Sequence, residues 1–165
     1  MARVYGRILT IFMLNAALVL AGCSSYQHPS VEVTGVRLGE VTDEAAALQF
    51  SVNMHNPNNE PLTLLEFEYG LHVDGRKVYE GKRAAETVLA TRGSKQVTIP
   101  AIIRFDATEP RWSPEAMPDE AQFSLNGKLK YITPGKIAEV LFDLGVKRPT
   151  VQFSDEGRVR LASTP

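Results

Sequence analysis

Residues 48–75 read LQFSVNMHNPNNEPLTLLEFEYGLHVDG, and this stretch contains the clearest structural pattern in the chain. Apolar and polar side chains alternate from Leu48 to Met54 and again from Leu65 to Val73. A period of two is typical of strands with one buried face. Asp74-Gly75 predicts a hairpin turn after the second strand, because both residues tolerate positive φ. We therefore expect two strands joined by an asparagine-rich segment, followed by a hairpin.

The asparagine-rich segment is either a polar site or a corner of the backbone. Asn56 precedes a proline, which restricts it to extended geometry. Pro57 presets φ for a turn, and Asn58 or Asn59 can adopt the left-handed conformation or hydrogen-bond its own backbone. We therefore interpret the segment as the loop between two strands, with His55 as an incidental neighbour. It is expected to carry no chemistry.

The same alternation continues through most of the chain, which predicts six to eight strands. We expect a bulge or bend at Gly81, a bulge or turn at Asn126-Gly127, and a last hairpin that turns through residues 155–157. Strands of this number and spacing in a chain of this size predict an all-β fold, an antiparallel β-sandwich. The further alternating runs are 31–38, 76–80, 97–105, 123–131 and 151–161.

One segment near the C-terminus has helical rather than strand periodicity. Apolar residues recur at spacings i, i+3, i+4 and i+7 between Ile137 and Leu144. Pro134 suits a first helical turn, and Gly145 suits a C-cap. The spacing predicts one short helix over residues 136–144, packed across a sheet edge or an open end of the sandwich.

The longest irregular segment, residues 106–119, contains three prolines and Trp112. Long loops often carry binding function, and an exposed tryptophan is a common anchor for a partner. Trp112 is therefore a candidate for partner contact. The alternative, which we favour, is that Trp112 folds back and caps the sandwich.

The N-terminus has the pattern of an exported lipoprotein. A basic start is followed by an apolar run over residues 8–20, which is shorter than the ~20 residues of a membrane span. This predicts a signal peptide over residues 1–22; a retained anchor helix is the alternative. The ending Leu-Ala-Gly-Cys matches the bacterial lipobox, which places cleavage between Gly22 and Cys23 and lipid on Cys23. Cys23 is the only cysteine, so no intramolecular disulfide can form.

The predicted mature chain consists of a lipidated tether, residues 23–30, and one domain, residues 31–165. Ser24, rather than aspartate, after the cysteine implies the outer membrane in a host with two membranes, with the domain facing the periplasm. Removal of residues 1–22 takes away two of 18 basic and none of 19 acidic residues, which leaves a formal charge of −3. This mixed balance offers no footprint for nucleic acid. We expect a monomer.

The residues needed for catalysis or metal binding do not converge in the sequence. The three histidines, His28, His55 and His72, are scattered without the paired spacing of metal ligands. No nucleophile-elbow glycines frame a serine, and there is no glycine-rich phosphate loop. We therefore expect neither an enzyme nor a cofactor. The one basic cluster is interpreted as protection of an edge strand or, alternatively, as a contact with anionic headgroups; it comprises Arg76, Lys77, Lys82 and Arg83.

The combination of Asn56-Pro57-Asn58, a strand, Asp74-Gly75 and the later Val97–Pro100 resembles the WHy domain (water stress and hypersensitive response) of type 2 late embryogenesis abundant proteins. The resemblance covers residues 31–165. It implies a fibronectin type III-like β-sandwich with a helix, and a role in tolerance of desiccation, cold or other stress through protection of client proteins. It implies no catalysis and no cofactor.

Two functions from different classes follow. The first is a non-catalytic, envelope-anchored lipoprotein that protects stress-sensitive client proteins or membrane. The second is a periplasmic binding or adaptor module for a lipid or an envelope-assembly partner, which would use the Trp112 loop or a cleft beside the predicted helix. An exposed apolar patch or a deep apolar pocket would favour the second.

Overall fold

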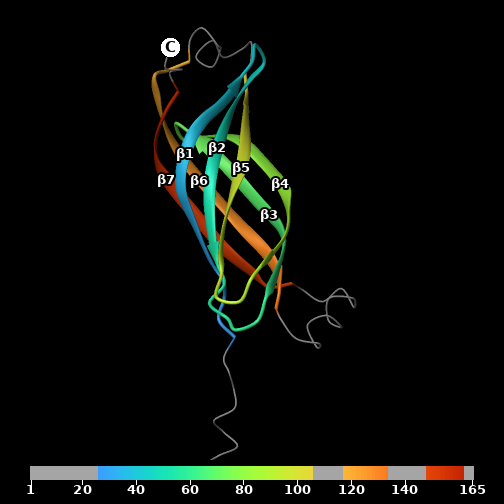
Figure 1. Ribbon diagram of the computed structural model, residues 1–165. Helices are drawn as coiled ribbons and strands as arrows, with labels where there is room; N and C mark the ends of the chain where they lie inside the picture. The colour runs from blue at the N-terminus through green and yellow to red at the C-terminus, as the bar shows by residue number, and fades with distance from the viewer. Residues whose placement is uncertain (1–25, 106–116, 134–147, 162–165) are drawn as a thin grey trace, which may run out of the picture.

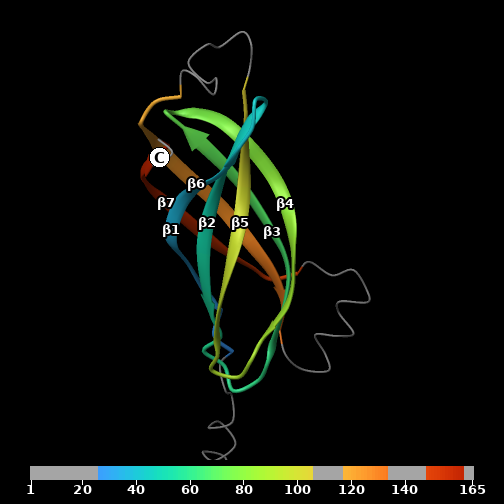
Figure 2. The ribbon, with the colours of Figure 1, turned by 45° about the horizontal axis from the view of Figure 1, so that its top comes forward.

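The computed structural model describes residues 26–105, 117–133 and 148–161, and in these ranges the chain forms seven strands in two antiparallel sheets. Strands of the four-stranded sheet cross behind those of the three-stranded sheet in Figure 1, and Figure 2 shows the same two layers from a tilted view. The three-stranded sheet has the order β1 (Ser30–Val41), β2 (Ala45–His55), β5 (Ser94–Arg104), and the four-stranded sheet has the order β4 (Arg76–Leu89), β3 (Leu62–Val73), β6 (Glu120–Ile132), β7 (Thr150–Arg160).

The predicted all-β antiparallel sandwich is therefore confirmed. The fibronectin type III-like label stays a prediction, and the helix predicted over residues 136–144 lies outside the described residues.

The core lies between the two sheets and is built by the alternation seen in the sequence. On β2, every second residue from Leu48 to Met54 is fully buried, while the residues between them face outward. Phe50 of one sheet packs edge-on against Phe123 of the other, with ring centroids 5.5 Å apart. Burial of such side chains stabilises the fold by roughly 1.5–3 kcal/mol each. Hydrophobic contact across the layers therefore holds the sheets together.

The strands at the sheet edges carry charged side chains. The predicted basic cluster lies on and beside the hairpin that begins β4, which is an edge strand, and Lys82 and Arg83 are exposed there. On the opposite edge, Asp155 of β7 pairs with the buried Leu125, so its side chain is on the inner face, and burial raises its pKa. Exposed lysines and inward-pointing charges both disfavour pairing of an edge strand with another chain.

The hairpin predicted at Asp74-Gly75 joins β3 to β4. Both residues have positive φ, 49° at Asp74 and 80° at Gly75. A two-residue turn of this hand matches the twist of the flanking strands. The prediction is confirmed, and glycine is required at its second position because a side chain there would be strained.

Two turn predictions were wrong. Residues 155–157 do not form a hairpin, because β7 pairs with β6 without interruption from Thr150 to Arg160. Asn126-Gly127 is neither a turn nor a bulge, because both residues pair in register with β3 on one side and β7 on the other. Turn-forming residues were here placed in strands by pairing with neighbours that are distant in sequence.

The irregularities lie elsewhere in the sheet. A register shift between Leu64 and Glu66 turns Leu64, rather than the expected Leu65, into the core. Gly81 pairs regularly with Tyr69, and the shift near the hairpin falls instead between Leu71 and His72 on β3. Such shifts change which face a side chain occupies, and the alternation of apolar residues alone does not locate them.

Candidate functional site

The predicted asparagine corner joins β2 to β3 at one end of the sandwich. Asn56 is fully buried. Its Nδ2 donates to the main-chain oxygens of Glu60 (2.8 Å) and Ala90 (3.1 Å), and its main-chain N donates to Gly93 O (2.9 Å). One side chain therefore ties the β2–β3 loop to the β4–β5 turn. Buried polar groups are tolerated when their hydrogen bonds are satisfied in this way.

Asn58 extends the same network to the start of the chain. Its main-chain N and its Nδ2 both donate to Asn56 Oδ1, at 3.0 and 3.1 Å. Its side chain also holds the main chain of Gln27, accepting from Gln27 N (2.9 Å) and donating to Gln27 O (2.7 Å). An amide placed this way pairs with backbone as a neighbouring strand would. The corner thus fixes the N-terminal segment as well as two loops.

The N-terminal segment contacts the sandwich through aromatic rings as well. Tyr26 stacks on the fully buried Tyr131, with ring centroids 6.3 Å apart, and His28 Nδ1 lies 2.5 Å from Tyr131 Oη. Burial raises the pKa of Tyr26 well above its usual range. Pro29 is buried. Residues 26–29, which we assigned to a tether, therefore belong to the folded domain.

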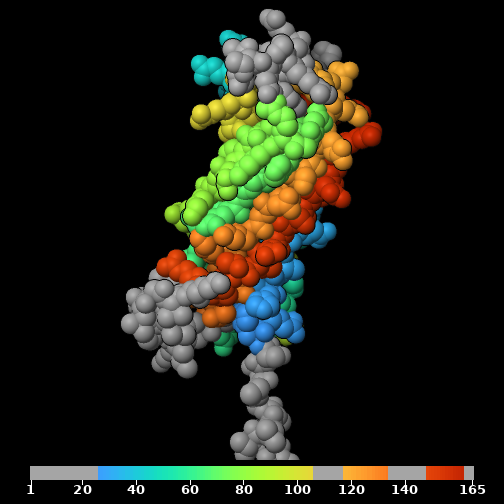
Figure 3. Space-filling view, turned by 180° about the vertical axis from the view of Figure 1, so that it is seen from behind, coloured from blue at the N-terminus to red at the C-terminus, as the bar shows by residue number. Residues whose placement is uncertain are grey.

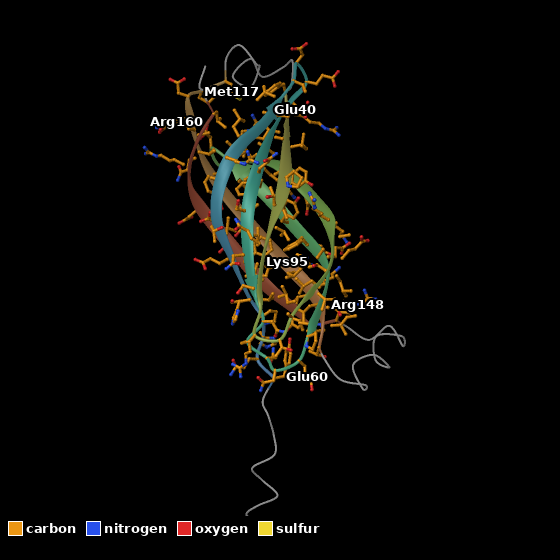
Figure 4. The ribbon with its side chains drawn as sticks, in the orientation of Figure 1. Glu40, Glu60, Lys95, Met117, Arg148 and Arg160 are labelled. Atoms are coloured by element: carbon orange, nitrogen blue, oxygen red, sulfur yellow. The ribbon has the colours of Figure 1, made fainter. Side chains whose placement is uncertain are left out.

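The sequence-predicted site residues do not converge. Figure 4 places Glu60, beside Asn56, Pro57 and Asn58, at the lower end of the sandwich. Asp74 and Gly75 follow β3, which begins next to the corner, and so lie a full strand away. The remaining predicted residues, Gly22, Cys23 and Trp112, lie outside the described ranges.

Metal-binding clusters and membrane-spanning helices are absent from residues 26–105, 117–133 and 148–161. In these ranges no three His, Cys, Asp or Glu residues group as metal ligands. His55 bonds Ser94 Oγ through Nδ1 at 3.0 Å, and His28 contacts tyrosines. No helix in this part of the chain is long and apolar enough to cross a membrane.

A second candidate is the outer face of the four-stranded sheet, whose strands run as diagonal bands across the face seen in Figure 3. Glu68 on β3 has Lys82 of β4 and Lys128 of β6 as its register partners. Lys82 Nζ lies 3.0 Å from Glu68 Oε1, and Lys128 Nζ lies 2.6 Å from Glu68 Oε2. Lys130 bridges Glu68 and Glu66, with 3.0 Å to Glu66 Oε1. One carboxylate thus receives three ammonium groups from two neighbouring strands.

The electrostatics of this face follow from that geometry. Hydrogen bonds from Lys128, Lys130 and Lys82 hold the pKa of the Glu68 carboxyl well below its usual range. The hydrogen bonds of Lys130 to Glu68 and Glu66 raise the pKa of its ammonium. Both effects favour the charged forms. Opposite charges on adjacent strands stabilise the pairing of those strands, so the network joins β4, β3 and β6.

The charged face borders an open groove of about 870 Å³. Gly70, Gly81 and Gly127, which have no side chains, are among its lining residues. Val31, Tyr69 and Phe153 also line it, so the groove offers apolar contacts as well as hydrogen bonds and charge of both signs to a surface or an extended chain. Its polar walls are Glu68, Glu80, Lys82, Asn126, Lys128, Gln152 and Ser154.

We did not identify this face from the sequence. A signal existed: Glu66 and Glu68 are spaced by two in one predicted strand, and Lys128 and Lys130 by two in another. Side chains two apart share a face of a strand. Complementary charges at that spacing would have predicted that these two strands are neighbours.

Replacing Glu68 with glutamine should lower the Tm at pH 7. Because the pKa of Glu68 is depressed in the folded state, its contribution is present above the pKa of the unfolded chain, ~4.3, and is lost as pH falls toward the folded pKa. The difference in Tm between Glu68→Gln and wild type should therefore become smaller as the pH is lowered below ~4.3. Thermal unfolding followed by circular dichroism at several pH values measures it.

Glu80→Gln is the matched control for this prediction. Glu80 pairs with the exposed Lys77 at 2.5 Å within one strand, and this pair does not join two strands. Exposed pairs of this kind contribute little, so the Tm shift should be smaller than for Glu68→Gln. Equal shifts would contradict a special role for the three-lysine network.

The sequence and fold match a known family and several solved structures. A family model described as late embryogenesis abundant protein matches residues 51–157. No curated protein matches the sequence. An Arabidopsis thaliana protein with a solution structure is 18% identical with a TM-score of 0.62, covering 86% of this chain and 87% of that one. A putative late embryogenesis abundant protein, also from Arabidopsis, is 20% identical with a TM-score of 0.59, covering 98% and 86%.

A protein from Archaeoglobus fulgidus is 13% identical with a TM-score of 0.52, covering 85% of this chain and 100% of that one. At these identities the solved structures show a shared fold alone. The family model spans well over half of the chain, including the asparagine corner and the charged face, while the finer WHy assignment stays a prediction. The chain therefore belongs to the late embryogenesis abundant protein family.

Proposed function

We propose that this chain is a non-catalytic lipoprotein of the bacterial cell envelope, anchored through Cys23, whose domain protects client proteins or membrane against desiccation and related stress. The observation that carries the stress role is the family match over residues 51–157. The Leu-Ala-Gly-Cys ending of the apolar N-terminal run supports the anchor. Ser24 after the cysteine supports the outer membrane. The proposal places the domain in the periplasm as a monomer.

The charged outer face supports a protective role in physical terms. Attraction between opposite charges strengthens as the effective dielectric constant falls, so the Glu68 network should hold β4, β3 and β6 together as water is withdrawn. The same face and its groove present many hydrogen-bonding groups. A polar surface that stays ordered on drying can replace water at the surface of a client protein.

A binding or adaptor module remains the second candidate, and the groove beside Glu68 is the observation that favours it. Its mixed lining, with charged side chains beside Val31, Tyr69 and Phe153, suits an extended peptide better than a lipid tail. Exposed large apolar side chains of the described residues are Val41, Val88 and Ile102, on three different strands or strand ends. In the described part of the chain, these three side chains do not form the broad apolar patch expected of the adaptor function.

A survival assay separates the two functions. A deletion strain should lose viability after drying and recover it when wild-type protein is restored. Crosslinking in the deletion strain that carries the restored wild-type protein should give many weak products rather than one stoichiometric partner. Unchanged survival together with one stoichiometric partner would favour the adaptor function and refute the protective one.

The anchor is tested separately with Cys23→Ser. Several acyl chains on one cysteine hold a protein stably on a membrane, so this variant should move from the membrane fraction to the soluble fraction almost completely. Ser24→Ala is the matched control and should stay in the membrane fraction. Retention on membranes of a Cys23→Ser chain from which residues 1–22 have been removed would exclude the lipid anchor.

A further inference from the structure

The segment that follows the anchor leaves the domain little freedom to move away from the membrane. Gln27 is held by two hydrogen bonds to Asn58, Tyr26 is stacked on Tyr131, and Pro29 is buried. The folded domain therefore includes Tyr26. If Cys23 carries lipid, as the proposed function states, only Ser24 and Ser25 lie between the lipidated residue and the folded domain.

The length of that connection sets the distance to the lipid. Fully extended, residues 23–25 span at most ~10 Å. Each strand of 11–14 residues is much longer, roughly 35–45 Å at 3.3 Å per residue. A connection this short cannot raise the domain by its own length. The end of the sandwich that carries the asparagine corner must therefore lie close to the headgroups.

The charges at the two ends of the sandwich fit this orientation. Considering the described loops and the two outermost residues of each strand, the corner end has three exposed cations, Arg92, Lys95 and Arg148, and one acid, Glu60. Figure 4 shows Glu60, Lys95 and Arg148 toward this end, with Glu40, Met117 and Arg160 at the other. By the same count, the far end has six acidic and four basic residues.

We infer that the corner end is a docking surface for anionic phospholipid headgroups, with Arg92 toward the phosphates and Lys95, whose Nζ donates to Thr87 Oγ1, adding positive charge beside it. Arg92 uses Nε to bond Asn59 Oδ1 at 2.9 Å, which orients its guanidinium within the exposed turn. Basic residues are attracted to anionic lipid surfaces within about a Debye length. The lipid supplies the anchor, and the corner supplies the orientation. The far end of the sandwich then points away from the membrane.

Depth-dependent quenching tests the orientation on the full lipidated protein. Glu60→Cys and Glu40→Cys each introduce a single free thiol for a fluorophore, because the natural cysteine carries the lipid. The proteins are reconstituted in phosphatidylethanolamine–phosphatidylglycerol vesicles that contain a headgroup-attached quencher. We expect at least fivefold stronger quenching at position 60 than at position 40. Equal quenching at the two positions would overturn the inferred orientation.

Two further comparisons test its causes. Combining Tyr26→Ala with Asn58→Ala should release the segment and bring the two quenching values within twofold of each other; Asn126→Ala, an exposed asparagine on the sheet face, is the control. Arg92→Gln with Lys95→Gln should reduce quenching at position 60 by half or more, whereas Arg76→Gln with Lys77→Gln at the far end should not. Unchanged quenching at position 60 in the Arg92→Gln, Lys95→Gln variant would overturn the headgroup contact.

The failure of this inference is distinguishable from failure of the proposed function. Mass spectrometry of the purified protein reports whether Cys23 carries lipid. A protein without lipid at Cys23 would overturn the anchor and the orientation together. A lipidated protein with equal quenching at both labels would overturn the orientation alone. The ratio of quenching at position 60 to quenching at position 40 is also measured in phosphatidylcholine vesicles. If it equals the ratio in phosphatidylethanolamine–phosphatidylglycerol vesicles, the role of anionic headgroups is overturned.

Discussion

Replacing Asn56 with alanine should lower the free energy of unfolding by about 3 kcal/mol, measured by urea denaturation at pH 7. The side chain is fully buried and donates to Glu60 O and Ala90 O while accepting from Asn58. Alanine removes all of these bonds at once. The two carbonyls and the Asn58 N–H would then lack those partners at a partly buried position, and each loss of a buried partner costs roughly 1–3 kcal/mol.

Two neighbouring substitutions separate this effect from a general sensitivity of the loop. Asn59→Ala removes an exposed side chain whose Oδ1 accepts one bond from Arg92, so it should cost less than ~1 kcal/mol. Asn56→Asp keeps the shape but cannot donate to the two carbonyls, and it buries a charge. It should therefore destabilise at least as much as alanine. Equal, small losses for Asn56 and Asn59 would show that the corner is not a structural hub.

The corner also shows how far sequence reasoning could reach. Pro57 and the adjacent asparagines predict a turn, because their backbone preferences are local. The bonds from Asn56 to Ala90 and from Asn58 to Gln27 connect residues 34 and 31 positions apart. Such partners follow from the three-dimensional path of the chain, which local preference does not specify. The loop was predicted, and its role in holding the N-terminus was not.

The charged face was missed for a related reason. Glu68 meets Lys82 and Lys128 only because β3 lies between β4 and β6 in a fixed register. Alternation in the sequence predicts which residues share a face of their own strand. It does not predict which strand lies beside which, and the groove depends entirely on that order.

The mistaken hairpin at residues 155–157 reflects competition between local and long-range preferences. Asp-Glu-Gly is a favourable turn sequence, but β7 gains a complete ladder with β6 when it continues straight. Its cost is an inward-facing Asp155 with a raised pKa. At the edge of a sheet this cost is tolerable, because the side chain is only half-buried. Gly157 in turn leaves room beside the Phe123 ring.

Replacing Gly127 with valine should lower the free energy of unfolding by about 2 kcal/mol in the same urea assay. Gly127 pairs with Phe153 across β6 and β7, and the Phe153 ring lies over the glycine. A Cβ there would be 2.8 Å from Cε1 and 2.9 Å from Cε2, and closer still to Cζ. Phe153 is buried and packs edge-on against Phe67, with centroids 6.0 Å apart, so the ring has little room to move.

The double substitution Gly127→Val with Phe153→Leu tests this cause. A smaller side chain at position 153 vacates the space that the valine needs, so the double variant should be more stable than the sum of the two single losses by at least ~1 kcal/mol. Gly35→Val is the control, because a Cβ on that strand residue meets no atom within 4 Å; it should be nearly neutral. Strict additivity at positions 127 and 153 would mean that valine destabilises through the backbone and not through the ring. Gly127 would then owe its place in β6 to the pairing with β3 and β7 and not to the aromatic core.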